Sequence, residues 1–131
     1  MINKKFKKRS DIILECVAEW FEVRVKDLIG QDRHRSLTHA RQAGYWLVMD
    51  MLDWSSMRTA TLFGNRDHST IIYGAKSFED KVKKDALLQR ELKLVRLYIL
   101  SRIKEYYAEL NSNDALDLID QKKLLGSGVA N

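Results

Sequence analysis

Eight consecutive residues combine a glycine turn with the start of a helix, and their side chains have the chemistry needed to read DNA. They are Gly64-Asn65-Arg66-Asp67-His68-Ser69-Thr70-Ile71. A helix that enters the major groove by its N-terminus needs short polar side chains there, with free backbone N–H groups that can face phosphate. A carboxylate can accept a hydrogen bond from the cytosine amino group, imidazole can donate one, and a hydroxyl can serve base or phosphate. The alternative is an ordinary helix start that Asp67 caps.

Helical segments joined by short turns must position this octet. The chain contains no proline, and apolar residues recur at helical spacing along most of its length. Gly30 closes a short helix as a C-cap, and Phe63-Gly64-Asn65 forms the corner of a helix-turn-helix. Ser10 and Ser36 are the expected caps of two other helices. By residue number, we expect helices from 10, around 26–29, from 36 to about 53, from 55 or 56 to 62, and from 67 to about 82.

One further helix is expected from residue 85 to residue 110, and it carries a long apolar stripe. The stripe consists of Leu88, Leu92, Val95, Ile99, Ile103, Tyr106 and Leu110. A helix of about 25 residues spans roughly 37 Å, more than the roughly 30 Å width of a domain of this size. The far half of the stripe therefore meets either a second chain, which gives a homodimer, or a short folded-back helix in residues 111–131.

Composition and charge limit the kinds of partner and the classes of protein that fit this chain. Lys plus Arg number 23 against 18 Asp plus Glu, a formal net charge of +5 that suits a polyanionic partner. Cys16 is the only cysteine, so no intrachain disulfide can form and a reducing, cytosolic setting is expected. His34 and His39 are five residues apart, which does not place them on one helix face, and Cys16 is expected to be buried, so no metal site is predicted. No pairing of a nucleophile with a base suggests an enzyme, and no stretch approaches the roughly 18 apolar residues of a membrane span.

Three separated motifs resemble the C-terminal DNA-binding domain of the bacterial replication initiator DnaA. The first helix carries Ile13, Val17, Ala18, Glu19 and Phe21, followed by Val23, Asp27 and Leu28. The second motif is Ala40-Arg41-Gln42-Ala43, which follows a basic loop at residues 33–35. The third is the octet, which is similar to the family's Gly-Gly-Arg-Asp-His-Thr-Thr-Val. This resemblance implies an all-α, Trp-repressor-like helix-turn-helix domain, here with a long C-terminal helix.

The resemblance also implies a role for individual residues. Arg33 falls on a loop arginine that enters the minor groove, and Arg41 on a helix residue that grips phosphate. Asp67, His68 and Ser69 fall on the residues that read the major groove. The full set of predicted DNA-binding residues is Arg33, Arg35, Arg41, Met57, Arg58, Asn65, Arg66, Asp67, His68, Ser69, Thr70 and Lys76.

Several departures from the family pattern affect the expected specificity. The family's Leu-Pro-Glu-Ile is replaced by residues 56–59, so Met57 stands where a proline touches DNA and Arg58 adds a basic group. Ser69 lacks the methyl group of the family's threonine. We therefore expect a variant of the family's DNA box. The initiator's ATPase module has no counterpart here, since there is no Gly-x-x-x-x-Gly-Lys-Ser/Thr loop, and no nucleotide or other cofactor is predicted.

The sequence thus predicts a basic arm at residues 1–9, a DnaA-like helix-turn-helix domain at residues 10–84, and a long helix and tail at residues 85–131. The expected function is sequence-specific binding of double-stranded DNA at DnaA-box-like sites by a free-standing, nucleoid-associated protein in the cytoplasm. Such a protein would regulate replication initiation or transcription. The alternative is a protein-interaction adaptor that uses residues 85–131 and in which the helix-turn-helix is residual.

Overall fold

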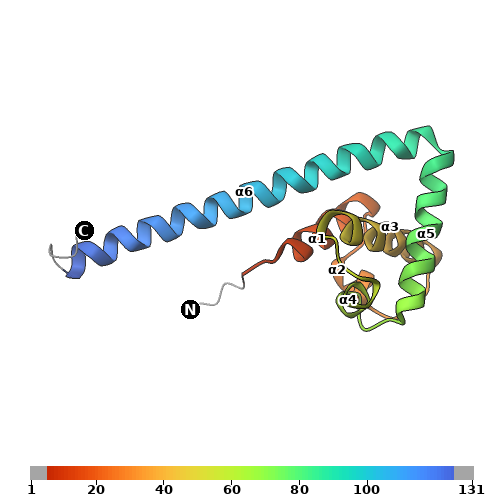
Figure 1. Cartoon of the computed structure of the whole chain (residues 1–131), viewed down its shortest axis with the longest axis horizontal. Helices are drawn as coiled ribbons and strands as arrows, with labels where there is room; N and C mark the ends of the chain where they lie inside the picture. The colour runs from red at the N-terminus through yellow and green to blue at the C-terminus, as the bar shows by residue number, and fades with distance from the viewer. Residues whose placement is uncertain (1–5, 126–131) are drawn as a thin grey trace. The chain divides into compact units, whose positions relative to one another are not determined.

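The computed structural model describes the backbone of residues 6–125 and the side chains of residues 6–112. Over these residues all regular secondary structure is helical, which confirms the all-α prediction. The helices in chain order are α1 (Arg9–Phe21), α2 (Val25–Ile29), α3 (Arg35–Leu52), α4 (Ser56–Leu62), α5 (His68–Lys84) and α6 (Ala86–Leu125) (Figure 1). The chain divides into two compact units, Met1–Ile99 and Leu100–Asn131, and every predicted DNA-binding residue lies in the first.

The core of the first unit forms from the apolar faces of α1, α3 and α5. Apolar residues three and four positions apart lie on one side of a helix, so each helix turns one stripe towards its neighbours. Fully buried side chains come from all three helices, with Ile13 and Val17 in α1, Leu47 and Val48 in α3, and Ile71 and Phe78 in α5. Helix α3 packs against both α1 and α5, so it is the central element that sets their positions.

Helix α5 approaches α3 closely at Gly74. A Cβ atom at this position would come within 2.8 Å of the Tyr45 ring, so only glycine leaves room for the two helices to cross here. Farther along the same contact, Trp46 Nε1 donates a hydrogen bond to Glu79 Oε1 at 3.3 Å. Packing on α3 therefore determines where the N-terminal end of α5 lies.

Helices α4 and α5 and the corner between them confirm the predicted helix-turn-helix. Ser55 caps α4, since its hydroxyl accepts a hydrogen bond from the Arg58 backbone N–H at 3.1 Å. At the corner, Gly64 has φ +87° and Asn65 has φ 61°. A Cβ atom on Gly64 would lie only 2.3 Å from the Ile29 carbonyl oxygen. Glycine is thus required both for its backbone conformation and because the corner rests on the end of α2.

Helix α6 begins at a side-chain cap and is longer than predicted. Asp85 Oδ1 accepts hydrogen bonds from the backbone N–H groups of Leu87 and Leu88, at 3.0 and 3.1 Å. The expected end near residue 110 and the separate short helix after it are wrong, because one continuous helix runs to Leu125. No glycine or proline interrupts the chain there. The side chains of residues 113–131 lie outside the described residues.

The apolar stripe of α6 contributes to the core of the first unit. Only 7% of Leu92 is exposed and Ile99 is fully buried. Neighbouring side chains support this packing, since Tyr98 donates its hydroxyl hydrogen to Glu19 Oε1 at 2.9 Å and Arg96 pairs with Asp50. These members of the stripe therefore do not offer an open face to a second chain, because their own domain already covers them.

Two helix starts differ slightly from the prediction. The expected caps Ser10 and Ser36 are wrong, because the N-cap residues of α1 and α3 are Lys8 and His34, each two positions earlier. In α1 the Asp11 carboxylate accepts a hydrogen bond from the Lys8 backbone N–H at 2.8 Å, so the cap comes from inside the helix. Residues 1–5 of the predicted basic arm lie outside the described residues.

Among the described helices, none combines the length and the apolar character required to cross a membrane.

Candidate DNA-binding surface

The first turn of α5 presents the polar side chains that the octet predicted. Asp67 is the N-cap, and its Oδ1 accepts hydrogen bonds from the Ser69 backbone N–H and the Ser69 hydroxyl, both at 3.0 Å. The backbone hydrogen bond from Ser69 lowers the pKa of Asp67, so the carboxylate is charged at neutral pH. His68 is exposed beside it, with Nδ1 3.7 Å from Asp67 Oδ1. Asp67 therefore caps the helix and still offers Oδ2 as an acceptor.

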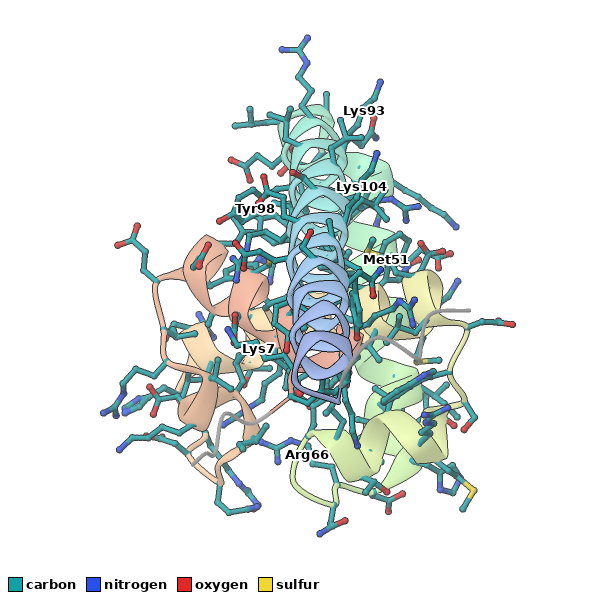
Figure 2. The ribbon with its side chains drawn as sticks, turned by 90° about the vertical axis from the view of Figure 1, so that its left-hand side faces the viewer. Lys7, Met51, Arg66, Lys93, Tyr98 and Lys104 are labelled. Atoms are coloured by element: carbon teal, nitrogen blue, oxygen red, sulfur yellow. The ribbon has the colours of Figure 1, made fainter. Side chains whose placement is uncertain are left out.

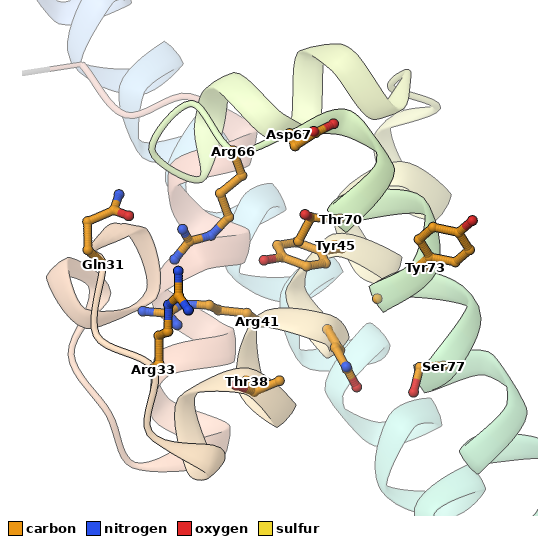
Figure 3. A pocket seen from close by; sticks show the side chains of 12 residues that line it. Gln31, Arg33, Thr38, Arg41, Tyr45, Arg66, Asp67, Thr70, Tyr73 and Ser77 are labelled. Atoms are coloured by element: carbon orange, nitrogen blue, oxygen red, sulfur yellow. The ribbon is translucent and has the colours of Figure 1, made fainter.

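Arg33 lies in the loop between α2 and α3, on the rim of a hollow that it shares with the start of α5. The hollow has a volume of about 720 Å³. Arg33 is exposed, and its guanidinium converges with those of Arg41 and Arg66 on one side, while Thr70 and Tyr73 stand on the other (Figure 3). The lining residues are Gln31, Arg33, Thr38, Arg41, Gln42, Tyr45, Arg66, Asp67, Thr70, Tyr73, Gly74 and Ser77.

Arg41 lies beneath this hollow and is 6% exposed. Its guanidinium donates to four backbone carbonyl oxygens at the end of α2 and in the following loop. The distances are 2.9 Å from Nε to Leu28 O, 2.5 Å from Nη1 to Asp32 O, and 2.6 and 3.1 Å from Nη2 to Asp27 O and Gly30 O. The last carbonyls of a helix have no partner inside the helix, so Arg41 supplies the donors that they need.

This burial changes the expectation for Arg41. The sequence predicted an exposed side chain that grips phosphate, whereas the structure buries it among carbonyl dipoles. Burial lowers the pKa of Arg41, and the neighbouring charge of Arg66 lowers it further. The guanidinium remains charged, since arginine does not deprotonate in proteins. The phosphate contact stays a prediction, and the geometry favours a structural role.

Arg66 reaches the same loop from the corner of the helix-turn-helix. Its Nη2 donates to Gly30 O at 2.5 Å, and its backbone N–H donates to Ala60 O at 3.1 Å. Figure 2 shows Arg66 between the side of the domain that carries α2 and the side that carries α4. The side chain is half-buried, so part of its charge still faces the hollow.

The other predicted DNA-binding residues lie outside the hollow. Arg35 is exposed at the first position of α3, and Met57, 68% exposed, is on the first turn of α4. The Arg58 guanidinium stacks 3.9 Å from the centre of the Trp54 ring. Lys76 lies 3.6 Å from Asp80 along α5. Asn65, His68 and Ser69 are in the turn and at the helix start, but they do not line the hollow.

The structure adds candidate contact residues that sequence reasoning missed. Tyr73 is 75% exposed and lines the hollow, and Ile72 beside it is also exposed. Thr38 and Gln42 contribute polar groups from α3. Helical spacing could have identified Tyr73, because it lies three residues after Thr70 and four after Ser69 on the same face of α5.

Comparison with known proteins places this domain in a family. Residues 10–77 match the family described as "Bacterial dnaA protein helix-turn-helix". The chain belongs to this family. The matched segment contains every predicted DNA-binding residue from Arg33 to Lys76, and it ends before α6. Membership confirms the resemblance drawn from the three motifs and implies DNA binding.

Individual relatives show how much of a longer protein the match covers. The chain is 36% identical over 90 residues to the chromosomal replication initiator protein DnaA of Pelobacter propionicus. The matched segment covers 69% of this chain and 20% of the relative. The corresponding protein of Crocosphaera subtropica is 38% identical over 94 residues, 70% of this chain and 21% of the relative. That of Treponema pallidum is 32% identical over 94 residues, covering 72% and 20%. The chain thus spans about a fifth of the length of these relatives.

Proposed function

We propose that this protein binds double-stranded DNA sequence-specifically at DnaA-box-like sites. The observation that carries the proposal is that Arg33 and the start of α5 flank the same hollow. In this arrangement Asp67, His68 and Ser69 read base edges in the major groove, and Arg33 enters the adjacent minor groove. The sugar-phosphate strand that separates the two grooves then crosses the hollow.

The chemistry of the hollow supports this path for the strand. Arg33 brings positive charge to it, and Thr38, Gln42 and Thr70 add neutral hydrogen-bonding groups. Backbone phosphates are bound by such mixtures of basic and neutral polar side chains, which position the protein without reading sequence. The net charge of +5 adds a long-range attraction to DNA.

The biological role that we propose is regulation of replication initiation or of transcription, without ATP hydrolysis. The relatives are named as chromosomal replication initiators, and only about a fifth of their length is matched here. A DNA-binding domain of this kind can occupy boxes and limit access by a full-length initiator without hydrolysing ATP. Genome-wide capture of the bound DNA, together with an ATP hydrolysis assay, tests this role.

The binding experiment is a site selection from random duplexes, followed by affinity measurements over a range of salt concentrations. We expect a selected sequence that contains a DnaA-box-like core, with an affinity that falls steeply as salt rises. Equal binding of the selected and random duplexes would overturn the proposal. If a partner protein is still captured normally when Arg33 and His68 are both replaced by alanine, the adaptor function is favoured instead.

Self-association through α6 remains a proposal, with a different face from the predicted one. The exposed leucines of α6 among the residues with described side chains include Leu87, Leu94, Leu97 and Leu100, whereas Leu92 and Ile99 are buried. Sedimentation of the wild type and of a Leu94→Glu/Leu97→Glu double variant tests this surface. A dimer that becomes a monomer on this change supports it, and a wild type that is monomeric at high micromolar concentration excludes it.

A further inference from the structure

One carbonyl oxygen links the two parts of the domain that are proposed to touch DNA. Gly30 O accepts a hydrogen bond from Arg66 Nη2 at 2.5 Å and another from Arg41 Nη2 at 3.1 Å. Arg66 belongs to the corner of the helix-turn-helix and Arg41 to α3. A carbonyl oxygen has two lone pairs, so both hydrogen bonds can form together. Gly30 is thus held from two sides by residues far from it in sequence.

The corner and the end of α2 touch at a second, adjacent point. Gly64 approaches the Ile29 carbonyl so closely that an added Cβ atom would lie 2.3 Å from the oxygen. Two successive carbonyls, those of Ile29 and Gly30, therefore contact the Gly64–Arg66 corner. Since α5 starts directly after this corner, the contact joins the start of α5 to the loop that follows Gly30.

The loop is held again immediately before Arg33. Arg41 Nη1 donates to Asp32 O at 2.5 Å, and the Asp32 carboxylate accepts a hydrogen bond from the His34 backbone N–H at 3.3 Å. The Arg33 side chain itself has no hydrogen bond or ion pair with any residue whose side chain the structure describes. Its backbone is therefore fixed while its guanidinium is free to enter a groove.

We propose that Arg66 is a positioning residue, which holds the Arg33 loop at a set distance from the start of α5 so that both grooves are read in one register. Arg41 fixes the other side of the same loop. The inference rests on the proposed function and deepens it, because it assigns Arg66 a part in specificity that does not require contact with DNA. The competing role for Arg66 is a direct phosphate contact.

The two roles differ in how the losses of affinity from replacing Arg66 and Arg33 combine. A positioning residue acts through Arg33, so its removal costs nothing further once Arg33 is gone. A phosphate contact acts independently, so its loss adds to that of Arg33 and lowers the slope of log affinity against log salt by about one. A double-mutant cycle with Arg33→Ala therefore separates the two roles.

The experiment measures affinity and selected sequence for the wild type, Arg66→Met, Arg33→Ala and the double variant. Methionine keeps much of the length of arginine but has no donor for Gly30 O. We expect each single change to weaken binding to the selected duplex roughly tenfold, as for one lost specific contact, and to relax only its A·T-rich end. The double variant is expected to match Arg33→Ala alone. Arg66→Lys is expected to restore most of the preference, since one donor is enough for Gly30 O.

Arg35→Ala is the control, because it also removes one positive charge, at the exposed start of α3, and no hydrogen bond to Gly30 is involved. Its effect should add to that of Arg33→Ala. The positioning role would be overturned if the losses of affinity caused by Arg66→Met and Arg33→Ala add in the double variant, and if Arg66→Met lowers the slope of log affinity against log salt in the Arg33→Ala background. An unchanged A·T preference in Arg66→Met would also overturn it.

A measurement without DNA separates this inference from the proposed function. Hydrogen exchange of the free protein should become faster at residues 31–34 in Arg66→Met and stay unchanged in the centre of α5. If the wild-type protein selects no DNA sequence, the proposed function fails. Hydrogen exchange then tests only whether Arg66 restrains the loop. Unchanged exchange at residues 31–34 would reject the inference even where DNA binding is specific.

Discussion

The two segments proposed to read DNA are held in place in different ways. The start of α5 is organised locally, because Asp67 caps the helix through the backbone of Ser69, two residues away. The loop that carries Arg33 is organised at long range. Its carbonyls at positions 30 and 32 are bound by side chains from α3 and from the corner of the helix-turn-helix, up to 36 residues away in the chain.

An exposed arginine and a buried arginine in the same region of the domain have different roles. Arg33 and Arg41 both belong to motifs shared with the family, and both were expected to touch DNA. Only Arg33 has a guanidinium open to solvent, while that of Arg41 serves the loop beneath it. A buried arginine can therefore support a proposed DNA-binding loop by holding its backbone.

The largest expected effect comes from breaking the long-range support. Arg41→Ala removes a donor from each of four carbonyl oxygens, of which that of Gly30 still accepts a hydrogen bond from Arg66. We expect the free energy of unfolding to fall by about 3 kcal/mol, as for the loss of buried hydrogen bonds to a charged group. Urea unfolding measures it, with Arg35→Ala as an exposed control that should change stability by less than about 0.5 kcal/mol. Full stability together with weaker binding to all duplexes would instead support a surface phosphate contact.

The second prediction tests the locally organised reader. His68→Ala should weaken binding to the selected duplex by about 1–3 kcal/mol and have much less effect on random DNA, because base contacts carry specificity. Lys76→Ala is the comparison, since an exposed lysine that contacts phosphate should weaken both duplexes alike. Equal losses on both duplexes for His68→Ala would show that its imidazole does not read bases.

The third prediction tests the loop reader. Arg33→Ala should cost about 1–2 kcal/mol at the A·T-rich end of the site and leave discrimination at the Asp67–His68 end intact. Arg33→Lys should recover little, because an ammonium is more strongly hydrated than the planar guanidinium. Site selection with both variants measures the effect. A loss of preference across the whole site at once would contradict the assignment of the two segments to separate grooves.

The smallest expected effect is the pH dependence of the Asp67 cap. The hydrogen bond from the Ser69 backbone lowers the pKa of this carboxyl below its ordinary value of 3.8. The folded state then binds the proton less readily than the unfolded state, so the stabilisation is complete above the ordinary pKa and is lost as pH falls through the folded value. Asp67→Asn keeps a capping oxygen but carries no charge. The difference in melting temperature between wild type and Asp67→Asn should therefore shrink below about pH 4, and a difference that is constant with pH would contradict this account.

Much of the domain could be predicted because its determinants are local. The all-α class, the helix-turn-helix corner and the capped start of α5 follow from helical periodicity, from Gly64 and from Asp67 as a preferred N-cap residue. The three motifs that place the chain in its family are also short and nearly continuous. These features depend on residues that are neighbours along the chain, so pattern alone identifies them.

Tertiary structure decided the rest. Whether an arginine in a motif is buried or exposed depends on which carbonyls surround it, and those carbonyls belong to other elements. The stripe on α6 also shows what sequence cannot determine. Periodicity identified an apolar face at Leu92 and Ile99, which are buried in the structure. It could not determine whether the same domain or a second chain would cover that face. Hydrogen bonds across the fold, such as that from Arg66 to Gly30, leave no periodic trace in sequence, because they arise only when distant segments pack together.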